Sequence, residues 1–124
     1  NGWNGTDWPS NIVDTYKHWV VDLDFNQCVT KWHDAIYAFH LDLLDKKIPH
    51  VFFNTFLSFN YDFITPYDWG NSYINPYSTT FYHWLQTQGF RTVNADSYHY
   101  SADAHRAWAN FLLTYLTNES IITT

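Results

Sequence analysis

Apolar residues recur along this chain at the spacing of a helix face in four segments. The recurrence predicts helices over residues 10–21, 26–47, 79–88 and about 101–116. Pro49 ends the second helix, because proline has no backbone N–H to donate. That helix has the clearest apolar stripe, which is formed by Cys28, Val29, Trp32, Ile36, Phe39, Leu43 and Leu44.

Two segments between the helices have the pattern of strands. Residues 51–57 form a nearly continuous apolar run, which is typical of a strand buried on both faces of a parallel sheet, and residues 90–93 predict a short final strand. Helices that alternate with a buried strand predict a layered α/β fold. Two strands make a poor sheet, so we expect further strands from residues before Asn1 or from another chain.

Composition narrows the class of protein. The 124 residues, 46% apolar and 22% aromatic, are enough for one globular domain spanning residues 1–124. The net charge of −6 and the lack of a basic patch argue against nucleic-acid binding. No run approaches the roughly 18 apolar residues of a membrane span. Cys28 is the only cysteine, which excludes an internal disulfide, and Glu119 is the only glutamate, which excludes a glycosidase with paired glutamates.

Candidate chemistry lies in one short segment before the last predicted helix. Asp96 and His99 are separated by two residues, and Ser101 is a suitable N-cap for the helix that follows. Across a tight turn the carboxylate can bond one ring nitrogen, which leaves the other nitrogen free to accept a serine proton. The pair therefore predicts the acid/base half of a serine hydrolase.

The same segment resembles the C-terminal block of the SGNH (GDSL) serine hydrolase family. Asp96 and His99 fall on its Asp-x-x-His positions, and His105, Trp108 and Ala109 fall on the helix that follows. The resemblance implies a three-layer, flavodoxin-like α/β sheet with flanking helices, of which this chain is the C-terminal part. By analogy with phage-encoded members, we expect a virion-associated or extracellular location.

The resemblance also implies an activity and a set of roles. His99 would be the general base of ester hydrolysis and Asp96 its orienting partner, acting on an ester or on acetyl groups of a carbohydrate. Asn4, in Gly2-Trp3-Asn4, matches the family's Gly-x-Asn block and would donate to the oxyanion. No cofactor is implied. The family's Gly-Asp-Ser nucleophile block does not occur in the sequence, so the serine would have to come from residues outside it.

Structural interpretations compete with these roles. Asp96 and His99 can cap a loop, and His105 shares an apolar helix face with Trp108, which favours a core histidine. The seven histidines are scattered, and no metal site is predicted because useful ligand pairs sit three or four residues apart on a helix.

Loop aromatics point to a second class of function. Residues 58–78 predict a long loop, and long loops in compact domains are often functional. Its aromatic side chains, like Trp3 and Trp8, can stack on sugars, form a protein interface or cover the core. The alternative function is therefore a non-catalytic structural module, or one that binds carbohydrate or protein, in a virion or surface assembly and with a hydrolase-derived fold.

Overall fold

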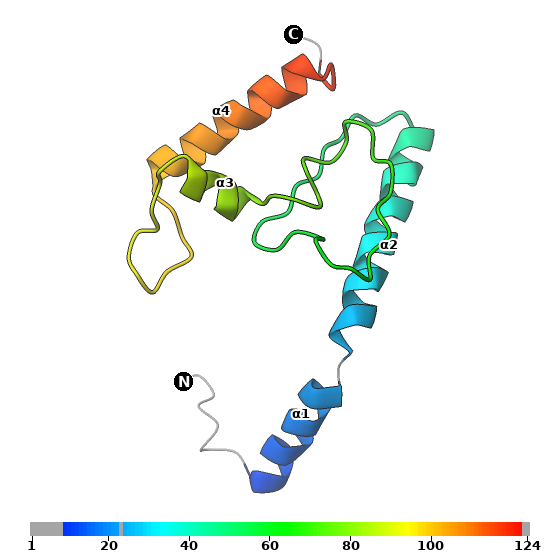
Figure 1. Cartoon of the computed structure of the whole chain (residues 1–124), viewed down its shortest axis with the longest axis vertical. Coiled ribbons are helices and arrows are strands. Elements are labelled where there is room, and N and C mark those ends of the chain that lie inside the picture. Colours follow the sequence, from blue (N-terminus) through cyan, green and yellow to red (C-terminus); the bar gives the residue numbers. More distant parts are fainter. Residues whose placement is uncertain (1–8, 23, 123–124) are drawn as a thin grey trace.

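The computed structural model describes residues 9–22 and 24–122, without the side chains of residues 16 and 18–22 (Figure 1). Each of the four predicted helices is confirmed. They are α1 (Ser10–Asp22), α2 (Phe25–Asp45), α3 (Phe81–Thr87) and α4 (Ala102–Asn118).

Local side-chain chemistry sets the helix boundaries. The Asp24 carboxylate accepts a hydrogen bond from the Gln27 backbone N–H at 3.1 Å at the start of α2, and the Thr80 hydroxyl accepts one from the His83 N–H at 3.0 Å at the start of α3. Ser101 occupies the N-cap position of α4, as predicted, without a side-chain hydrogen bond. Gly89 follows α3 with a φ of +89°, a conformation that side chains with a Cβ rarely adopt.

The predicted α/β fold is wrong. The described residues contain no sheet, and extended pairing is limited to two isolated bridges, Phe52 with Tyr73 and Thr92 with Tyr100. Neither residues 51–57 nor residues 90–93 form a strand. The three-layer flavodoxin-like arrangement is therefore overturned, and with it the description of the chain as an α/β hydrolase fold or a fold derived from one. Residues 9–22 and 24–122 contain no partial sheet that further strands could extend.

The backbone of residues 51–57 finds partners that are not strands. The Phe52 N–H donates to the Ser72 carbonyl at 2.8 Å, and the Phe52 carbonyl accepts from the Ile74 N–H at 2.9 Å. Further on, the Asn54 carbonyl accepts from the Phe81 N–H at 2.8 Å. The long loop and the start of α3 thus satisfy polar groups that a sheet would otherwise have to satisfy.

Two clusters of buried side chains form the core, one on each side of this extended segment. The first lies where α3 meets α4 and consists of Leu85, Tyr100, Ala104 and Trp108. In the second, the loop over residues 58–78 packs against α2, and its buried members include Val29, His33, His40, Ile64, Trp69, Tyr73 and Ile74.

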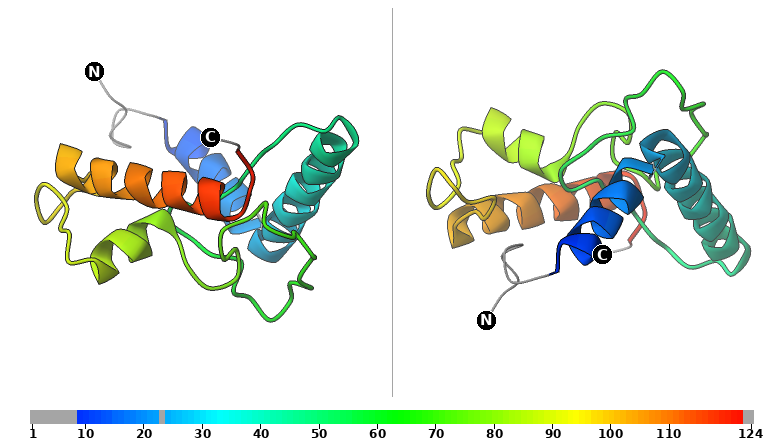
Figure 2. Two further views of the ribbon diagram at one scale, coloured as in Figure 1. Left: turned by 90° about the horizontal axis from the view of Figure 1, so that it is seen from above. Right: turned by 90° about the horizontal axis from the view of Figure 1, so that it is seen from below.

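The helices are spread rather than bundled. α3 and α4 lie side by side and are the two described helices that contact each other. α2 lies at the edge of the molecule, and the long loop occupies the space between it and the α3–α4 pair (Figures 1 and 2). α1 continues beyond the N-terminal end of α2 (Figure 1).

Candidate functional site

Asp96 and His99 lie on a loop that is closed at its base. Thr92 pairs with Tyr100, and the Val93 N–H donates to the His99 carbonyl at 2.8 Å. Because Tyr100 is buried in the α3–α4 core, it anchors the loop to that core. The loop is therefore held in place at its two ends, whereas its tip is exposed.

The structure does not join the predicted acid and base. Asp96 and His99 are both exposed, and in the described part of the chain no hydrogen bond or ion pair links their side chains. Asn94 Oδ1 accepts from the Asp96 N–H at 3.0 Å, and Ser97 Oγ accepts from the His99 N–H at 2.9 Å. Asn94 and Ser97 thus make the local turns. The third predicted site residue, Asn4, lies outside the described residues, and the proposed roles of all three stay predictions.

His105 is not the core histidine that its position predicted. Its side chain is exposed, and its ring stacks on Phe81 at a centroid distance of 5.8 Å. The ring lies over the outer face of the α3–α4 core, whose centre is filled by Trp108 and Leu85. The helical period correctly placed His105 on the face of α4 that meets the core. It could not distinguish the buried centre of that face from its exposed rim.

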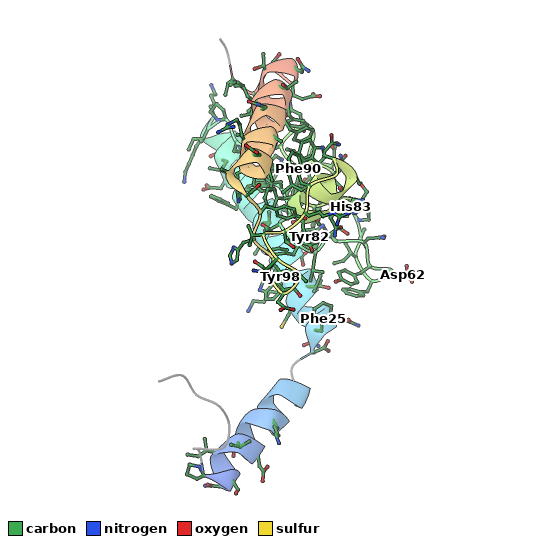
Figure 3. The ribbon with its side chains drawn as sticks, turned by 90° about the vertical axis from the view of Figure 1, so that its left-hand side faces the viewer. Phe25, Asp62, Tyr82, His83, Phe90 and Tyr98 are labelled. Atoms are coloured by element: carbon green, nitrogen blue, oxygen red, sulfur yellow. The ribbon has the colours of Figure 1, made fainter. Side chains whose placement is uncertain are left out.

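The structure places an open cavity between the loop and α3. Its volume is about 330 Å³. The walls combine apolar side chains with hydroxyl, amide and imidazole groups, from Phe56, Leu57, Ser58, Asn60, Tyr61, Ser78, Thr79, Thr80 and His83. We call this the α3 cavity. In Figure 3, His83 lies on the side of α3 that faces the loop carrying Asp62, whereas Tyr82 and Tyr98 lie close to each other on the other side.

Backbone hydrogen bonds fix the two walls of the α3 cavity relative to each other. The Tyr82 N–H donates to the Thr55 carbonyl at 3.0 Å, and the Phe59 N–H donates to the Pro76 carbonyl at 2.8 Å. The first bond lies just before the wall formed by residues 56–61, and the second lies within that wall. Thr80 belongs to the other wall, over residues 78–83, and caps α3. The cavity is thus formed by paired backbone segments rather than by loose side chains.

The polar groups of the α3 cavity are available to a ligand. Within the described residues, the side chains of Ser58, Asn60, Ser78 and Thr79 make no hydrogen bond, and neither does the His83 ring. Hydroxyl and amide groups can each donate and accept, and a neutral imidazole can do the same through its two nitrogens.

Aromatic rings border these polar groups. The Tyr61 ring stacks on Phe63 with a centroid distance of 5.1 Å, and Phe56 is half exposed. Phe56 also contacts Tyr82 and Tyr98, at centroid distances of 5.8 and 5.9 Å. The α3 cavity therefore offers apolar ring surface beside hydrogen-bonding groups.

A second group of polar and aromatic side chains lies between α2 and the loop. The Tyr77 hydroxyl is its centre: it lies 2.9 Å from His33 Nε2, and it accepts from Trp69 Nε1–H and from the Tyr67 backbone N–H, each at 2.8 Å. We call these four residues the Tyr77 cluster. Since a hydroxyl oxygen has two lone pairs and both are used, its O–H donates to His33 Nε2. His33 is therefore neutral, with its proton on Nδ1.

His40, the second buried histidine on α2, also forms a hydrogen bond through one ring nitrogen. His40 Nδ1 lies 2.6 Å from His50 Nε2, and His50 Nδ1 lies 2.7 Å from the Ile48 carbonyl. A carbonyl can only accept, so His50 Nδ1 carries the proton in its hydrogen bond with Ile48. The two rings and the Ile48 carbonyl thus form one short chain of hydrogen bonds.

Burial dominates the electrostatics of the two α2 histidines. It lowers the pKa of His33, and the nearby Asp34 carboxylate opposes that shift only in part. Burial also lowers the pKa of His40, with a further contribution from His50 and an opposing one from Asp68. These rings stabilise the core in their neutral form. The predicted apolar stripe did not include either histidine, although His33 and His40 are buried and Trp32 of that stripe is exposed. The sequence pattern also gave no sign of the tyrosine partner.

Most of the loop aromatics serve the core. Trp69 and Tyr73 are buried, and the Tyr67 ring stacks on Tyr37 of α2 at a centroid distance of 3.9 Å. Tyr61 is the member of the loop set that lines the α3 cavity. Trp3 and Trp8 lie outside the described residues.

No protein-family model matches this chain, and the searches of curated proteins and of solved structures give no match either. In residues 9–22 and 24–122, no three or more His, Cys, Asp and Glu side chains are grouped so that they could hold a metal ion. Over the same residues, no helix has both the length and the apolar character needed to cross a membrane.

Proposed function

We propose that this protein is a non-catalytic binding module and that its ligand is a neutral carbohydrate held in the α3 cavity. The observation that carries the proposal is the pairing, in one cavity, of exposed ring surface with polar side chains that have no partner in the described structure. Ligand sites typically combine an apolar lining with a small number of placed polar groups.

Sugar chemistry fits both parts of the lining. A sugar ring has an apolar face of C–H groups, which can lie on Tyr61 or Phe56, and a rim of hydroxyls, which need donors and acceptors together. Ser58, Asn60 and Ser78 supply such groups. The protein's net charge of −6 disfavours an anionic ligand and leaves a neutral one as the better fit.

Ester hydrolysis is not proposed. The described residues lack the sheet that positions the catalytic groups of the SGNH family, and Asp96 and His99 do not contact each other. The α3 cavity, by contrast, is bordered by side chains that are already in place.

The proposal is tested by NMR titration of the ¹⁵N-labelled protein with neutral mono- and disaccharides. We expect shifts confined to the amides of residues 56–61 and 78–83, with dissociation constants of about 1 mM or tighter. Tyr61→Ala and His83→Ala should each weaken binding, because they remove a wall and a hydrogen-bonding group. No perturbation by any sugar, or shifts elsewhere in the protein, would contradict the proposal.

His99→Ala is the matched control. It also removes an exposed imidazole, but from a position outside the cavity, so binding should be unchanged. A second assay follows release of acetate from an acetylated sugar, and we expect none above background. Release that the wild type shows and His99→Ala loses would overturn the non-catalytic assignment in favour of the acid/base pair.

A further inference from the structure

A further cavity lies where α2 and α4 end. Both helices end toward the top of Figure 1, and the long loop contributes residues 71 and 72 to the cavity. Its volume is about 290 Å³, which is at the small end of the range for ligand sites. We call it the helix-end cavity. The lining residues used below are Leu44, Lys47 and Ile48 at the end of α2, Ser72 in the loop, and Ser120 and Ile121 after α4.

The same turn closes both helices beside the helix-end cavity. In each turn an isoleucine N–H donates to the carbonyl five residues before it at 2.9 Å, from Ile48 after α2 and from Ile121 after α4. The residue before each isoleucine has a positive φ, +56° at Lys47 and +58° at Ser120. Glycine is the usual residue at that position of such a turn. Strained residues gather at functional sites, and here both strained positions carry a polar side chain that lines one cavity.

Hydrogen bonds fix the loop wall of the helix-end cavity relative to its other walls. Asn71 Nδ2 donates to the Glu119 carbonyl at 2.8 Å, and the Tyr115 hydroxyl donates to the Asn71 carbonyl at 2.7 Å, so the loop is tied to the end of α4. The next loop residue is tied to the segment that follows α2, because the Phe52 N–H donates to the Ser72 carbonyl at 2.8 Å. The cavity is therefore preformed.

Ser72 carries a polar group that lacks a partner. The residue is only 6% exposed, and within the described structure its hydroxyl forms no hydrogen bond. Its oxygen is not sealed from solvent, unlike Trp108 Nε1, so it is reached through the cavity that Ser72 lines. A buried hydroxyl without a partner costs free energy, and a ligand that accepts its hydrogen bond removes that cost.

The charge in the helix-end cavity is positive. Lys47 forms no ion pair in the described part of the chain, whereas its neighbour Lys46 is paired with Asp42 at 2.9 Å, and no described Asp or Glu lines the cavity. His50 also lines the cavity, but both of its ring nitrogens are already hydrogen-bonded. The charged and hydroxyl groups free to bind are thus one ammonium and two hydroxyls. A single cation matches a monoanion whose oxygens accept hydrogen bonds.

The local charge decides here rather than the protein's net charge of −6. Exposed charges more than about 10 Å away are screened by salt, whereas the Lys47 ammonium belongs to the wall of the cavity. No lysine or arginine lines the α3 cavity, so the argument for a neutral ligand there does not extend to this one.

The apolar part of the lining is mostly aliphatic. Leu44 and Ile48 are 52% and 46% exposed, and Ile121 is half-buried. A ligand with a hydrocarbon chain would cover these side chains and remove apolar surface from water. A chain of about four to eight carbons suits a cavity of this size.

We propose that the helix-end cavity binds a small monocarboxylate with a short aliphatic chain. The carboxylate oxygens accept hydrogen bonds from the Lys47 ammonium and from the hydroxyls of Ser72 and Ser120, and the chain lies against the aliphatic wall. This proposal is independent of the carbohydrate proposal, since the two cavities share no lining residue.

NMR titration of the ¹⁵N-labelled full chain with sodium hexanoate tests the proposal. We expect shifts at the amides of residues 44–50, 71–72 and 120–121, with a dissociation constant of about 1 mM or tighter. Hexanamide has the same chain without the charge, and acetate has the charge without the chain, so each should bind at least about tenfold more weakly. The absence of shifts at about 10 mM hexanoate would overturn the proposal, as would hexanamide binding as tight as that of hexanoate.

Lys47→Gly separates binding from stability. Glycine adopts a φ of +56° without strain, so the thermal midpoint should equal or exceed that of the wild type, while the loss of the ammonium should weaken hexanoate binding at least about tenfold. Lys46→Ala is the matched control. It makes the same change in net charge one residue away, from a side chain that does not line the cavity, and should change the dissociation constant by less than about twofold.

Ser72→Ala tests the buried hydroxyl. It should weaken hexanoate binding by about threefold to tenfold, because the carboxylate loses a buried donor. Equal effects of Lys47→Gly and Lys46→Ala on hexanoate binding would overturn the proposal, since a contact with the Lys47 ammonium requires them to differ.

Discussion

The Tyr77 hydroxyl contributes to the stability of the core beside α2, and removing this single oxygen measures its contribution. Tyr77→Phe removes that oxygen and keeps the ring. His33 Nε2 then loses its donor, while Trp69 Nε1–H and the Tyr67 N–H lose their acceptor. His33 is 1% exposed and Trp69 is 5% exposed, so water cannot readily replace the lost oxygen at either group.

The expected loss of stability in Tyr77→Phe depends on how many buried polar groups are left without a hydrogen-bond partner. A buried polar group that loses its partner costs about 1–3 kcal/mol. Tyr67 is only half buried, so its N–H can reach water and adds little. We therefore expect Tyr77→Phe to lower the free energy of unfolding by about 3 to 5 kcal/mol. That is a large part of the 5–15 kcal/mol typical of a whole domain, so the variant should be visibly destabilised.

Urea denaturation followed by far-UV circular dichroism measures this loss as a lower midpoint at an unchanged slope. Tyr115→Phe is the matched control, because it removes the same atom from a hydroxyl that donates a single hydrogen bond, to the Asn71 carbonyl at 2.7 Å. Its loss should be about 1 kcal/mol. Equal losses in the two variants would refute the three-way role of the Tyr77 hydroxyl.

The pH dependence of the same variant tests the tautomer of His33. The wild-type hydroxyl donates to Nε2, so that nitrogen can take a proton only by breaking the hydrogen bond. In Tyr77→Phe nothing donates to Nε2, and the pKa of His33 should rise toward its ordinary value of 6.5. The variant should therefore lose less stability than the wild type between pH 7 and pH 5. Parallel pH profiles would show that the hydroxyl does not donate to this ring.

Three further outcomes follow from single contacts. The wild-type protein should lose stability as the pH falls below 6.5. The pKa values of His33 and His40 are lowered in the folded state, so the unfolded chain takes up protons first. Urea midpoints that do not change from pH 7.5 to pH 5.5 would contradict this. Trp108→Phe should lower the free energy of unfolding, measured with urea, by about 1 to 2 kcal/mol less than Trp69→Phe does. The reason is that the buried Trp108 Nε1–H has no partner in the described structure, whereas the Trp69 Nε1–H donates to Tyr77. Equal losses in the two variants would exclude a role for the Trp69 hydrogen bond. Gly89→Ala should lower the free energy of unfolding by about 1 kcal/mol, because a residue with a Cβ is strained at a φ of +89° even though no atom lies within 4 Å of that Cβ. A thermal midpoint equal to that of the wild type would show that the turn relaxes.

Periodicity predicted the helices because a helix that packs on one side must repeat its apolar residues at the helical period. The cap of α3 by Thr80 and the turn at Gly89 lie within a residue or two of the predicted ends. The α3 cavity could not be predicted in the same way. Its walls come from segments about 20 residues apart, which backbone hydrogen bonds bring together, and periodicity carries no information on such pairing.

The Asp96–His99 interpretation shows the limit of a short motif. Two residues between an acid and a histidine permit contact across a turn, but Asn94 and Ser97 make the local turns instead, and the two side chains do not meet. Asn and Ser are frequent turn residues for this reason, since their side chains bond nearby backbone. The sequence predicted a loop here, but it did not show that Asn94 and Ser97, rather than Asp96 and His99, make its turns.

The apolar run over residues 51–57 explains why an α/β pattern can arise without a sheet. An extended segment can be apolar on both faces when each face contacts an aromatic cluster, and here Phe52 contacts Trp69 whereas Phe53 contacts Trp108. The expectation that the run is buried throughout is wrong, because Phe56 and Leu57 at its end are 52% and 67% exposed. Asn54, the polar residue in the middle of the run, distinguishes this segment from a strand in a sheet. Asn54 accepts a hydrogen bond from the Tyr73 hydroxyl and donates one to the Pro76 carbonyl at 3.1 Å. A strand inside a sheet is held by its neighbours' backbones and does not need such a side chain. Asn54 therefore ties the segment to the loop, and because the next residues form a wall of the α3 cavity, the same contacts that replace the sheet also position the proposed binding site.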